Sequence, residues 1–316
     1  MTTLLEQLTT DRRLRRFDDI SHLLPDVDQP TPIVRLRRLA PSASLYLKLE
    51  WLNPFGSVKD RTASYLLAES RVDPTQRLVE ASSGNTAIAL AALAARAGIP
   101  ITVTIPEGVP AEKKILLRML GAEVLETPDD LCPVDHPRDG AIALARAIAH
   151  SPGNEHYVWP DQYSNPANVR AHYETTGPEI WRQSEGRIET FVAALGTCGT
   201  VTGVGRFLKE CNPAVRIVAI EPNPGHRLAG LKSFAEANVP EILDASVIDD
   251  VVRIDDGSAY ATTRRLFREE GLIVGPSTGA IVAGALTLGE PGLTVAISPD
   301  SGFKYASFFA DQLDER

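Results

Sequence analysis

NPFGSVKDR, residues 53–61, joins an apolar strand pattern at 45–50 to a helical pattern at 62–69. The Pro/Gly turn within it brings Lys59 to the opening of the predicted helix. The positive end of the helix dipole disfavours a charged lysine there, and a lysine with a lowered pKa can act as a nucleophile or as a base. Taken alone, the same stretch also fits an ordinary surface lysine at the start of a helix.

Outward from this turn, short apolar strands alternate with helices rich in alanine and leucine. Strands are predicted at 33–36, 78–81, 101–105, 123–125, 157–159, 190–194, 216–221, 250–254 and 293–297. Helices are predicted at 87–97, 111–120, 140–150, 201–209, 257–270 and 280–288, and an irregular stretch at 222–240. This alternation indicates βαβ units and parallel sheets, and therefore an α/β protein.

Two such series of strands and helices predict two lobes with a ligand between them, at the carboxyl ends of the strands. We expect a smaller mobile lobe at 53–162 and a larger lobe formed by 31–52 and 163–316. Residues 1–30 begin with an amphipathic pattern and are predicted to form an N-terminal helical arm.

Composition and charge limit the classes of partner. The 316 residues are 43% hydrophobic and 23% charged, as in ordinary globular proteins. A formal net charge of −9 argues against nucleic acid and anionic membrane surfaces as partners. No apolar run of about 18 residues predicts a membrane span, and the first 28 residues are too charged for a secretory leader.

The cysteines and histidines predict neither disulfides nor a metal site. Cys132, Cys198 and Cys211 are widely spaced and form no CxxC pair. The histidines, His172 and His226 among them, show no ligand spacing and are interpreted as ordinary polar residues. This pattern fits a protein of the reducing cytoplasm.

A glycine-rich turn, GTCGT at 196–200, follows an apolar strand and opens a helix. Its glycines let backbone N–H groups converge on an anion, and two threonine hydroxyl groups supply further donors. The turn lacks the Walker lysine and the GxGxxG spacing. A phosphate cradle and a plain strand-to-helix turn are both compatible with this stretch.

Two further loops carry hydroxyl groups at predicted helix starts. SSGNT at 82–86 combines hydroxyl groups with backbone N–H groups, which suits a carboxylate ligand. GPSTGA at 275–280 offers a serine hydroxyl at the end of an apolar strand. Helix capping is the structural alternative for both loops.

Six ordered segments together resemble the cysteine synthase family of fold-type II pyridoxal-phosphate enzymes. They are NPFGSVKDR (53–61), EASSGNTAIALA (80–91), DQYSNPANVRAHYETTGPEIW (161–181), ALGTCGTVTGVGRFLKE (194–210), EEGLIVGPSTGA (269–280) and PDSGFKYAS (299–307). The segments follow the family's order and cover residues 32 to 307. The resemblance implies a two-lobed, three-layer αβα fold with parallel-rich sheets, like that of the tryptophan synthase β subunit.

The same resemblance implies pyridoxal 5'-phosphate as cofactor and a role for each matching residue. Lys59 matches the lysine that binds the cofactor covalently, Asn85 matches the asparagine at its phenolic oxygen, and Ser277 matches the serine facing its pyridine nitrogen. The residues that match the phosphate loop are Gly196, Thr197, Cys198, Gly199 and Thr200. Those that match the substrate α-carboxylate site are Ser82, Ser83, Gly84, Thr86 and Gln162.

The implied reaction is β-replacement on an O-activated L-serine with sulfide or a sulfide donor, giving L-cysteine. The ending PDSGFKY resembles the branch that accepts O-phosphoserine, in which a basic residue meets the substrate phosphate. Lys232 falls near that place instead of the expected arginine, and a lysine binds phosphate less specifically, so O-acetylserine stays open. A solvated loop position is the structural alternative for Lys232.

Other functions remain open at this point. Ser82 and Ser83 stand where a Thr-Ser pair is commoner, and Ala87 replaces a glycine, so other nucleophiles are not excluded: an amine, homocysteine, thiosulfate or a carrier-protein thiocarboxylate. A serine or threonine dehydratase and a catalytically idle regulatory paralogue are the competing hypotheses. The segment at 161–181 favours the synthase, and the retained lysine, asparagine and phosphate loop argue against an idle paralogue. The resemblance also implies a homodimer, with a sulfide-carrier protein as a further candidate partner.

Overall fold

A computed structural model of the chain describes residues 16–129, 140–289 and 292–310. Cys132 and the first 15 residues of the predicted arm lie outside this part. Of the arm, residues 16–30 are described, and they contain a single 3-10 turn at Ile20–Leu23. No helix in the described ranges is long and apolar enough to cross a membrane.

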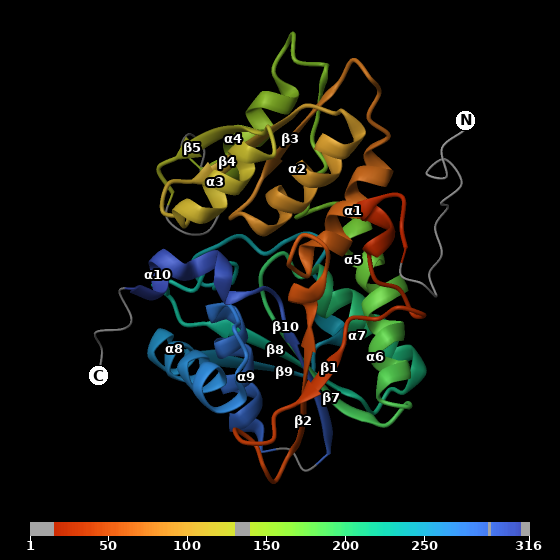
Figure 1. Ribbon diagram of the computed structural model, residues 1–316, viewed down its shortest axis with the longest axis vertical. Coiled ribbons are helices and arrows are strands. Elements are labelled where there is room, and N and C mark those ends of the chain that lie inside the picture. Colours follow the sequence, from red (N-terminus) through yellow and green to blue (C-terminus); the bar gives the residue numbers. More distant parts are fainter. Residues whose placement is uncertain (1–15, 130–139, 290–291, 311–316) are drawn as a thin grey trace, which may run out of the picture.

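The larger sheet has the strand order β1-β2-β10-β7-β8-β9 (Figure 1). All its neighbouring strands are parallel except β1 and β2, which are antiparallel. The strands are β1 (Ile33–Arg35), β2 (Ser44–Leu49), β7 (Ile188–Ala194), β8 (Arg216–Pro222), β9 (Asp250–Ile254) and β10 (Leu293–Ser298). The α/β class and the parallel-rich sheets predicted from the sequence are confirmed.

The smaller sheet is entirely parallel among the described strands, in the order β5-β4-β3-β6. Its strands are β3 (Arg77–Ala81), β4 (Ile101–Pro106), β5 (Glu123–Thr127) and β6 (Tyr157–Val158). Every residue of β4 is buried, because helices cover both faces of this sheet. The division into lobes at 53–162 and at 31–52 with 163–316 stays a prediction.

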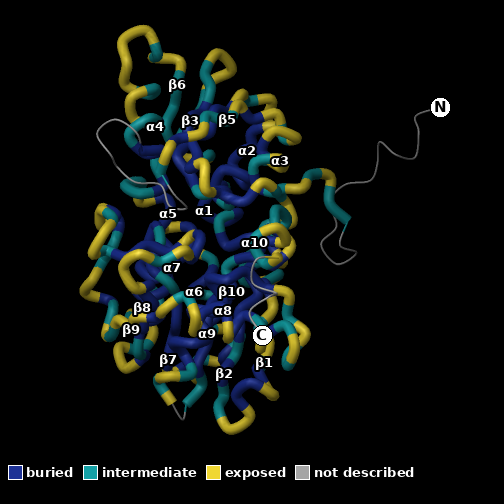
Figure 2. Tube along the Cα trace, turned by 90° about the vertical axis from the view of Figure 1, so that its left-hand side faces the viewer, coloured by how far each residue is buried: buried dark blue, intermediate teal, exposed yellow. Residues whose placement is uncertain are grey.

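Helices lie on both faces of each sheet, and Figure 2 shows the buried chain running through the interior of both parts. The smaller sheet packs against α1 (Lys59–Ser70), α2 (Asn85–Ala97) and α3 (Ala111–Met119) on one face and α4 (Ala141–His150) on the other. The larger sheet packs against α8 (Asp256–Arg265) and α9 (Pro276–Leu288) on one face and α6 (Gly177–Gln183) and α7 (Gly199–Cys211) on the other. The helices α5 (Ala167–Ala171) and α10 (Ala306–Ala310) complete the set.

Several predicted helix boundaries are corrected, and α2 and α9 begin at Asn85 and Pro276, before the predicted starts at 87 and 280. The helix expected at 201–209 begins earlier, at Gly199, because the last two residues of the glycine-rich turn already belong to the first turn of α7. The helix expected at 257–270 ends at Arg265 and continues as a π turn at Leu266–Glu270. A second π turn at His172–Thr176 separates α5 from α6.

A buried cluster of charges links α1 to the larger sheet. Arg61 donates to Glu50 at 2.7 Å and to Glu179 at 2.5 Å, and Lys48 donates to Glu179 at 2.8 Å. Burial alone would lower the pKa of Arg61, but the two carboxylates raise it above its ordinary value. Two cations and two anions therefore balance one another just behind the turn that carries Lys59.

Candidate functional site

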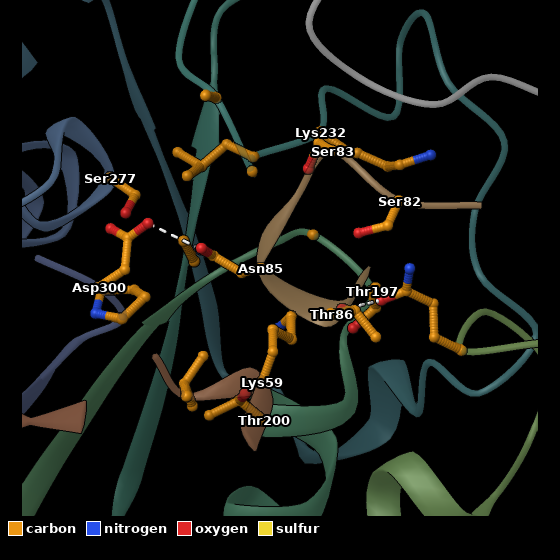
Figure 3. A pocket seen from close by; sticks show the side chains of 18 of the residues that line it. Lys59, Ser82, Ser83, Asn85, Thr86, Thr197, Thr200, Lys232, Ser277 and Asp300 are labelled. Atoms are coloured by element: carbon orange, nitrogen blue, oxygen red, sulfur yellow. Dashed lines mark hydrogen bonds between the residues drawn. The ribbon is translucent and has the colours of Figure 1, made fainter. Parts of the chain in front are cut away.

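A cavity opens between the two sheets, at the carboxyl ends of β3, β7 and β10 (Figure 3). The walls come from the loops at 82–86, 195–200 and 299–300, the start of α1 and the segment at 229–232. Of the residues singled out in the sequence, the cavity is lined by Lys59, Ser82, Ser83, Asn85, Thr86, Gln162, Gly196, Thr197, Cys198, Thr200, Lys232 and Ser277. Gly84 and Gly199 belong to the same loops but do not line the cavity.

Lys59 is the first residue of α1 and is partly buried in the cavity wall. Burial lowers its pKa to about 8, although Cys198 and Asp300 oppose this shift. The sequence predicts this direction from the helix dipole, whereas the largest physical cause is loss of solvation. The preceding turn is closed by Asp60, whose carboxyl group accepts from the Phe55 N–H at 2.6 Å and from the Ser57 hydroxyl at 3.1 Å.

The turn at 196–200 enters α7 through a tightly packed backbone. Cys198 adopts φ 68°, in the left-handed region that favours glycine. A Cβ on Gly196 would lie 2.6 Å from the Gly230 carbonyl oxygen, and a Cβ on Gly199 would lie 2.1 Å from Asn168 Oδ1. The backbone thus approaches its neighbours as only glycine allows. The first N–H groups of α7 have no partner within the helix, so this turn can bind an anion at the edge of the cavity.

Asn168 and His172 hold the two threonines of that turn from behind. Asn168 Nδ2 donates to Thr197 Oγ1 at 3.0 Å, and its Oδ1 accepts from Thr62 Oγ1 at 2.9 Å. His172 Nε2 lies 3.2 Å from Thr200 Oγ1 and 3.3 Å from Thr62 Oγ1. Burial, followed by the nearby cations, lowers the pKa of His172 to about 3, so its imidazole is neutral at physiological pH.

The hydrogen bonds around His172 show which group donates and which accepts at its Nε2 atom. Thr62 uses its proton on Asn168, so at His172 Nε2 the Thr62 oxygen can only accept. This assigns the proton to Nε2 and leaves Nδ1 to accept from the Thr176 hydroxyl at 2.9 Å. In that tautomer the hydroxyl proton of Thr200 is available for a ligand. The interpretation of His172 as an ordinary polar residue stays a prediction, because His172 supports the turn from behind and is not among the described residues that line the cavity. Its position four residues after Asn168, within the segment at 161–181, is the signal that sequence reasoning overlooked.

The loop at 82–86 is organised by Ser82 and Thr86. Ser82 Oγ accepts from the N–H groups of Gly84 and Ala87 at 3.0 and 3.2 Å, in the manner of a helix cap. Thr86 donates to Gln162 Oε1 at 2.6 Å, and Gln162 Nε2 donates to the Ala81 carbonyl oxygen at 2.7 Å. The N-cap residue of α2 is Gly84 and no side-chain cap hydrogen bond forms, so Ser82 orders the start of the helix without being its N-cap. The two bonds leave its own hydroxyl proton unused.

Ser277 and Asp300 face the cavity from the larger sheet's side. Ser277 lies in the first turn of α9, but the N-cap residue is Gly275 and no side-chain cap hydrogen bond forms. The capping alternative for Ser277 is therefore wrong. Asp300 accepts from Asn85 Nδ2 at 2.7 Å, the contact drawn as a dashed line in Figure 3. Asp300 was within a matching segment but was not predicted as a site residue.

Lys232 contributes a buried cation to the same cavity. Its side chain is 5% exposed, so the alternative of a solvated loop position is wrong. Its Nζ lies 4.6 Å from the ring centroid of Tyr163, a distance suited to a cation–π contact. Its backbone N–H donates to the Leu195 carbonyl oxygen at 2.8 Å, which ties this segment to the end of β7.

Comparison with known proteins gives consistent matches over most of the chain. A family model described as "Pyridoxal-phosphate dependent enzyme" matches residues 24–300. Cysteine synthase B of Salmonella typhimurium strain LT2 is 41% identical over 286 residues, covering 88% of this chain and 92% of that protein. Cysteine synthase B of Pseudomonas aeruginosa is 42% identical, with coverage of 88% and 93%. The crystal structure of O-ureido-L-serine synthase is similar with a TM-score of 0.83 and 36% identity, covering 95% of this chain and 97% of that one.

Proposed function

This chain belongs to the family of pyridoxal-phosphate dependent enzymes, and we propose that it catalyses β-replacement on an O-activated L-serine with sulfide or a sulfide donor, giving L-cysteine. The observation that carries the proposal is a cavity in which a lysine of lowered pKa lies with an anion-binding turn and a loop rich in hydroxyl groups. The relatives named cysteine synthase support the choice of reaction.

The residues present fit pyridoxal phosphate. Lys59 would bind it covalently, and the turn at 196–200, with the hydroxyl protons of Thr197 and Thr200, would hold its phosphate. Asn85 and Ser277 would face its ring. When bound, the cofactor supplies an electron sink that makes the substrate Cα proton acidic and allows the β-leaving group to depart.

The loop at 82–86 with Gln162 would bind the substrate α-carboxylate. Ser82 Oγ already accepts two backbone N–H groups, so its own proton would be available to the carboxylate. Thr86 donates its hydroxyl proton to Gln162 Oε1, and this hydrogen bond fixes both side chains at the cavity wall. Held in this way, the substrate would present its Cα proton to the Lys59 amine, which acts as the general base.

Attachment of the cofactor to the apo-protein is expected to accelerate as pH rises toward 8. Only the neutral amine attacks an aldehyde, and burial lowers the pKa of Lys59 to about 8. Below that value the rate should increase about tenfold per pH unit, and above it the rate should level off. Stopped-flow absorbance after mixing apo-protein with pyridoxal phosphate measures this profile. A rate still climbing tenfold per unit above pH 9 would contradict the lowered pKa.

Lys232 is proposed to bind the phosphate of O-phosphoserine. A buried cation stabilises a dianionic leaving group more than a neutral one, so Lys232→Met should lower kcat/KM for O-phosphoserine about tenfold or more. The kcat/KM of Lys232→Met for O-acetylserine should stay unchanged. Lys232→Arg keeps the charge and serves as the matched control, which should retain most of the preference. Equal losses with both donors would remove this role and leave O-acetylserine as the preferred substrate.

His172 is proposed to strengthen phosphate binding through Thr200. Replacing it by phenylalanine fills the space but removes the N–H that Thr200 Oγ1 accepts, so the dissociation constant for the cofactor should rise about tenfold. Equilibrium dialysis of the apo-protein with pyridoxal phosphate measures this change. His156→Ala is the control, because His156 is exposed on the smaller sheet's side. Unchanged affinity in His172→Phe would show that Thr200 is held by other contacts.

The proposed reaction is tested by supplying the purified protein with O-acetylserine or O-phosphoserine together with sulfide. Cysteine as the product supports the synthase. Pyruvate and ammonia, formed with sulfide present, would identify a dehydratase instead. If neither donor is consumed and no cofactor is bound, the idle paralogue is the better description. Replacing sulfide by thiosulfate, homocysteine, an amine or a carrier-protein thiocarboxylate then identifies the preferred nucleophile.

Assembly and location are proposed on the family resemblance. We expect a homodimer in the cytoplasm, with a sulfide-carrier protein as a candidate partner. Analytical ultracentrifugation tests the homodimer, since a protein that is monomeric at micromolar concentration would exclude it. The division into a mobile lobe at 53–162 and a larger lobe remains part of this proposal.

A further inference from the structure

Asp300 joins side chains from distant parts of the chain at the edge of the cavity. It follows β10, is 1% exposed, and accepts at Oδ2 from Asn85 Nδ2 at 2.7 Å and from the Tyr305 hydroxyl at 2.6 Å. Tyr305 in turn accepts from Lys113 Nζ at 2.9 Å. Lysine can only donate and a carboxylate can only accept, so every bond in this chain has a defined direction. Burial, together with Asp300, also raises the pKa of Tyr305 well above its ordinary value, which keeps this donor protonated.

The amide of Asn85 has a donor on one side and an acceptor on the other. Its Oδ1 lies 3.4 Å from Lys304 Nζ, which also donates to the carbonyl oxygens of Phe55 and Gly56 at 3.0 Å. A flipped amide would turn its NH₂ group toward the Lys304 ammonium and its oxygen toward Asp300. Both contacts would then be repulsive, so one orientation is selected. Asp300 accepts one of the two Nδ2 hydrogens, and the Asn85 amide also bonds the Tyr305 hydroxyl, so a cofactor oxygen would share the second hydrogen with that hydroxyl.

The second oxygen of Asp300 is held at a helix N-terminus. Oδ1 is buried without a hydrogen-bond partner, and an ideal Cβ on Gly275 would lie only 2.1 Å from it. Gly275 is the N-cap residue of α9, the helix that carries Ser277. The positive end of this 13-residue helix stabilises a negative charge at that position. Asp300 therefore lies against the start of α9 on the larger sheet's side, while Asn85 belongs to α2 on the smaller sheet's side.

We propose that Asp300 is a positioning residue that orients the Asn85 amide, so that the second Nδ2 hydrogen is donated to the phenolic oxygen of the bound cofactor. The Tyr305 hydroxyl, which accepts from Lys113, donates to Asp300 and holds it in place. Lys304 contacts Asn85 Oδ1 on the opposite side and favours the same orientation of the amide. The inference rests on the proposed function, because it assigns a partner to Asn85 within the same cofactor site. The role assigned to this carboxylate is to set the geometry of a group that contacts the cofactor.

A double-mutant cycle on cofactor binding tests this coupling. Asn85→Ala should raise the dissociation constant of pyridoxal phosphate about tenfold and shift the visible absorption maximum of the bound cofactor. Asp300→Ala should change both quantities in the same direction and by a similar factor. The double variant should be no worse than Asn85→Ala alone, because Asp300 acts through that amide. Effects that multiply instead would mean that the two side chains act independently, and would overturn the proposal.

Two further variants separate orientation from general loosening of the C-terminal segment. Asp300→Asn keeps the shape of the side chain but permits the flipped amide, so it should shift the absorption maximum while remaining folded. Glu112→Gln weakens another contact of this segment, in which Glu112 accepts from the Ser307 N–H at 2.7 Å and from its hydroxyl at 2.8 Å, and it should leave the spectrum unchanged. A wild-type spectrum and affinity in both Asp300 variants would overturn the proposal while the proposed function stands. Failure of the wild-type protein to bind the cofactor would instead refute the proposed function.

Discussion

Lys59→Ala is expected to abolish covalent binding of pyridoxal phosphate and to lower kcat/KM by about 10³-fold or more. The lysine has two proposed tasks, since it anchors the cofactor and then removes the Cα proton of the substrate. Its position at the start of α1, beside the turn at 196–200, leaves no second amine in the same geometry among the described lining residues, where the other lysine is Lys232. Borohydride reduction followed by mass spectrometry of the peptides locates the adduct.

The matched control for this experiment is Lys114→Ala. Lys114 lies on α3 and pairs with Glu126 outside the cavity, so its loss should leave the adduct and the activity unchanged. Added methylamine should restore part of the activity of Lys59→Ala, because a small free amine can enter the space that the side chain leaves. An adduct found on another lysine, or full activity in Lys59→Ala, would remove the basis of the proposed reaction.

Glu179→Ala should cost about 3–5 kcal/mol in the free energy of unfolding. Glu179 accepts from Arg61 and from Lys48, and all three side chains are 2% exposed or less. Removing its carboxylate leaves Lys48 buried without its nearest counter-charge, and it leaves Arg61 with Glu50 alone. The burial of Lys48 already lowers its pKa, so this lysine should lose its proton in the variant at a still lower pH. Urea denaturation, read from the transition midpoint at constant slope, measures the loss.

The control for this change is Glu174→Ala. Glu174 lies in the same segment but is exposed, where it accepts from the Tyr65 hydroxyl, so its removal should alter stability by about 0.5 kcal/mol or less. Replacing both Lys48 and Glu179 by methionine should recover part of the loss, because no buried charge then lacks its partner. A midpoint for Glu179→Ala equal to that of the wild type would mean that water reaches this cluster.

The predicted elements agree best with the structure where local pattern decides the conformation. The runs at 101–105 and 216–221 are rich in apolar and β-branched residues, and they form strands that are buried on both faces except at Arg216. The boundaries that differ lie where side chains from elsewhere intervene. At Gly199, where α7 begins earlier than predicted, the Asn168 side chain fills the space beside the glycine.

The missed residues Asp300 and His172 each have at least one partner that is remote in sequence. Asn85 and Asp300 are 215 residues apart, and Thr62 and His172 are 110 apart. Periodicity and capping rules concern neighbours within a few positions, so they carry no information about such pairs. Asp300 and His172 nevertheless lie inside segments that resemble the family. The resemblance therefore indicates that these positions matter, but it does not indicate which residues they contact.

The sequence by itself determined the α/β class, the order of the six segments and the chemistry of the groups they carry, because these depend on local pattern and residue type. The tertiary structure decided how those groups behave. The pKa of Lys59 is lowered mainly by burial in the cavity and less by its position at the start of a helix. Lys232 lies in a loop, but its side chain is buried and lines the same cavity. Solvation and long-range contact arise only when distant segments meet, and that is the physical reason why sequence alone left them undecided.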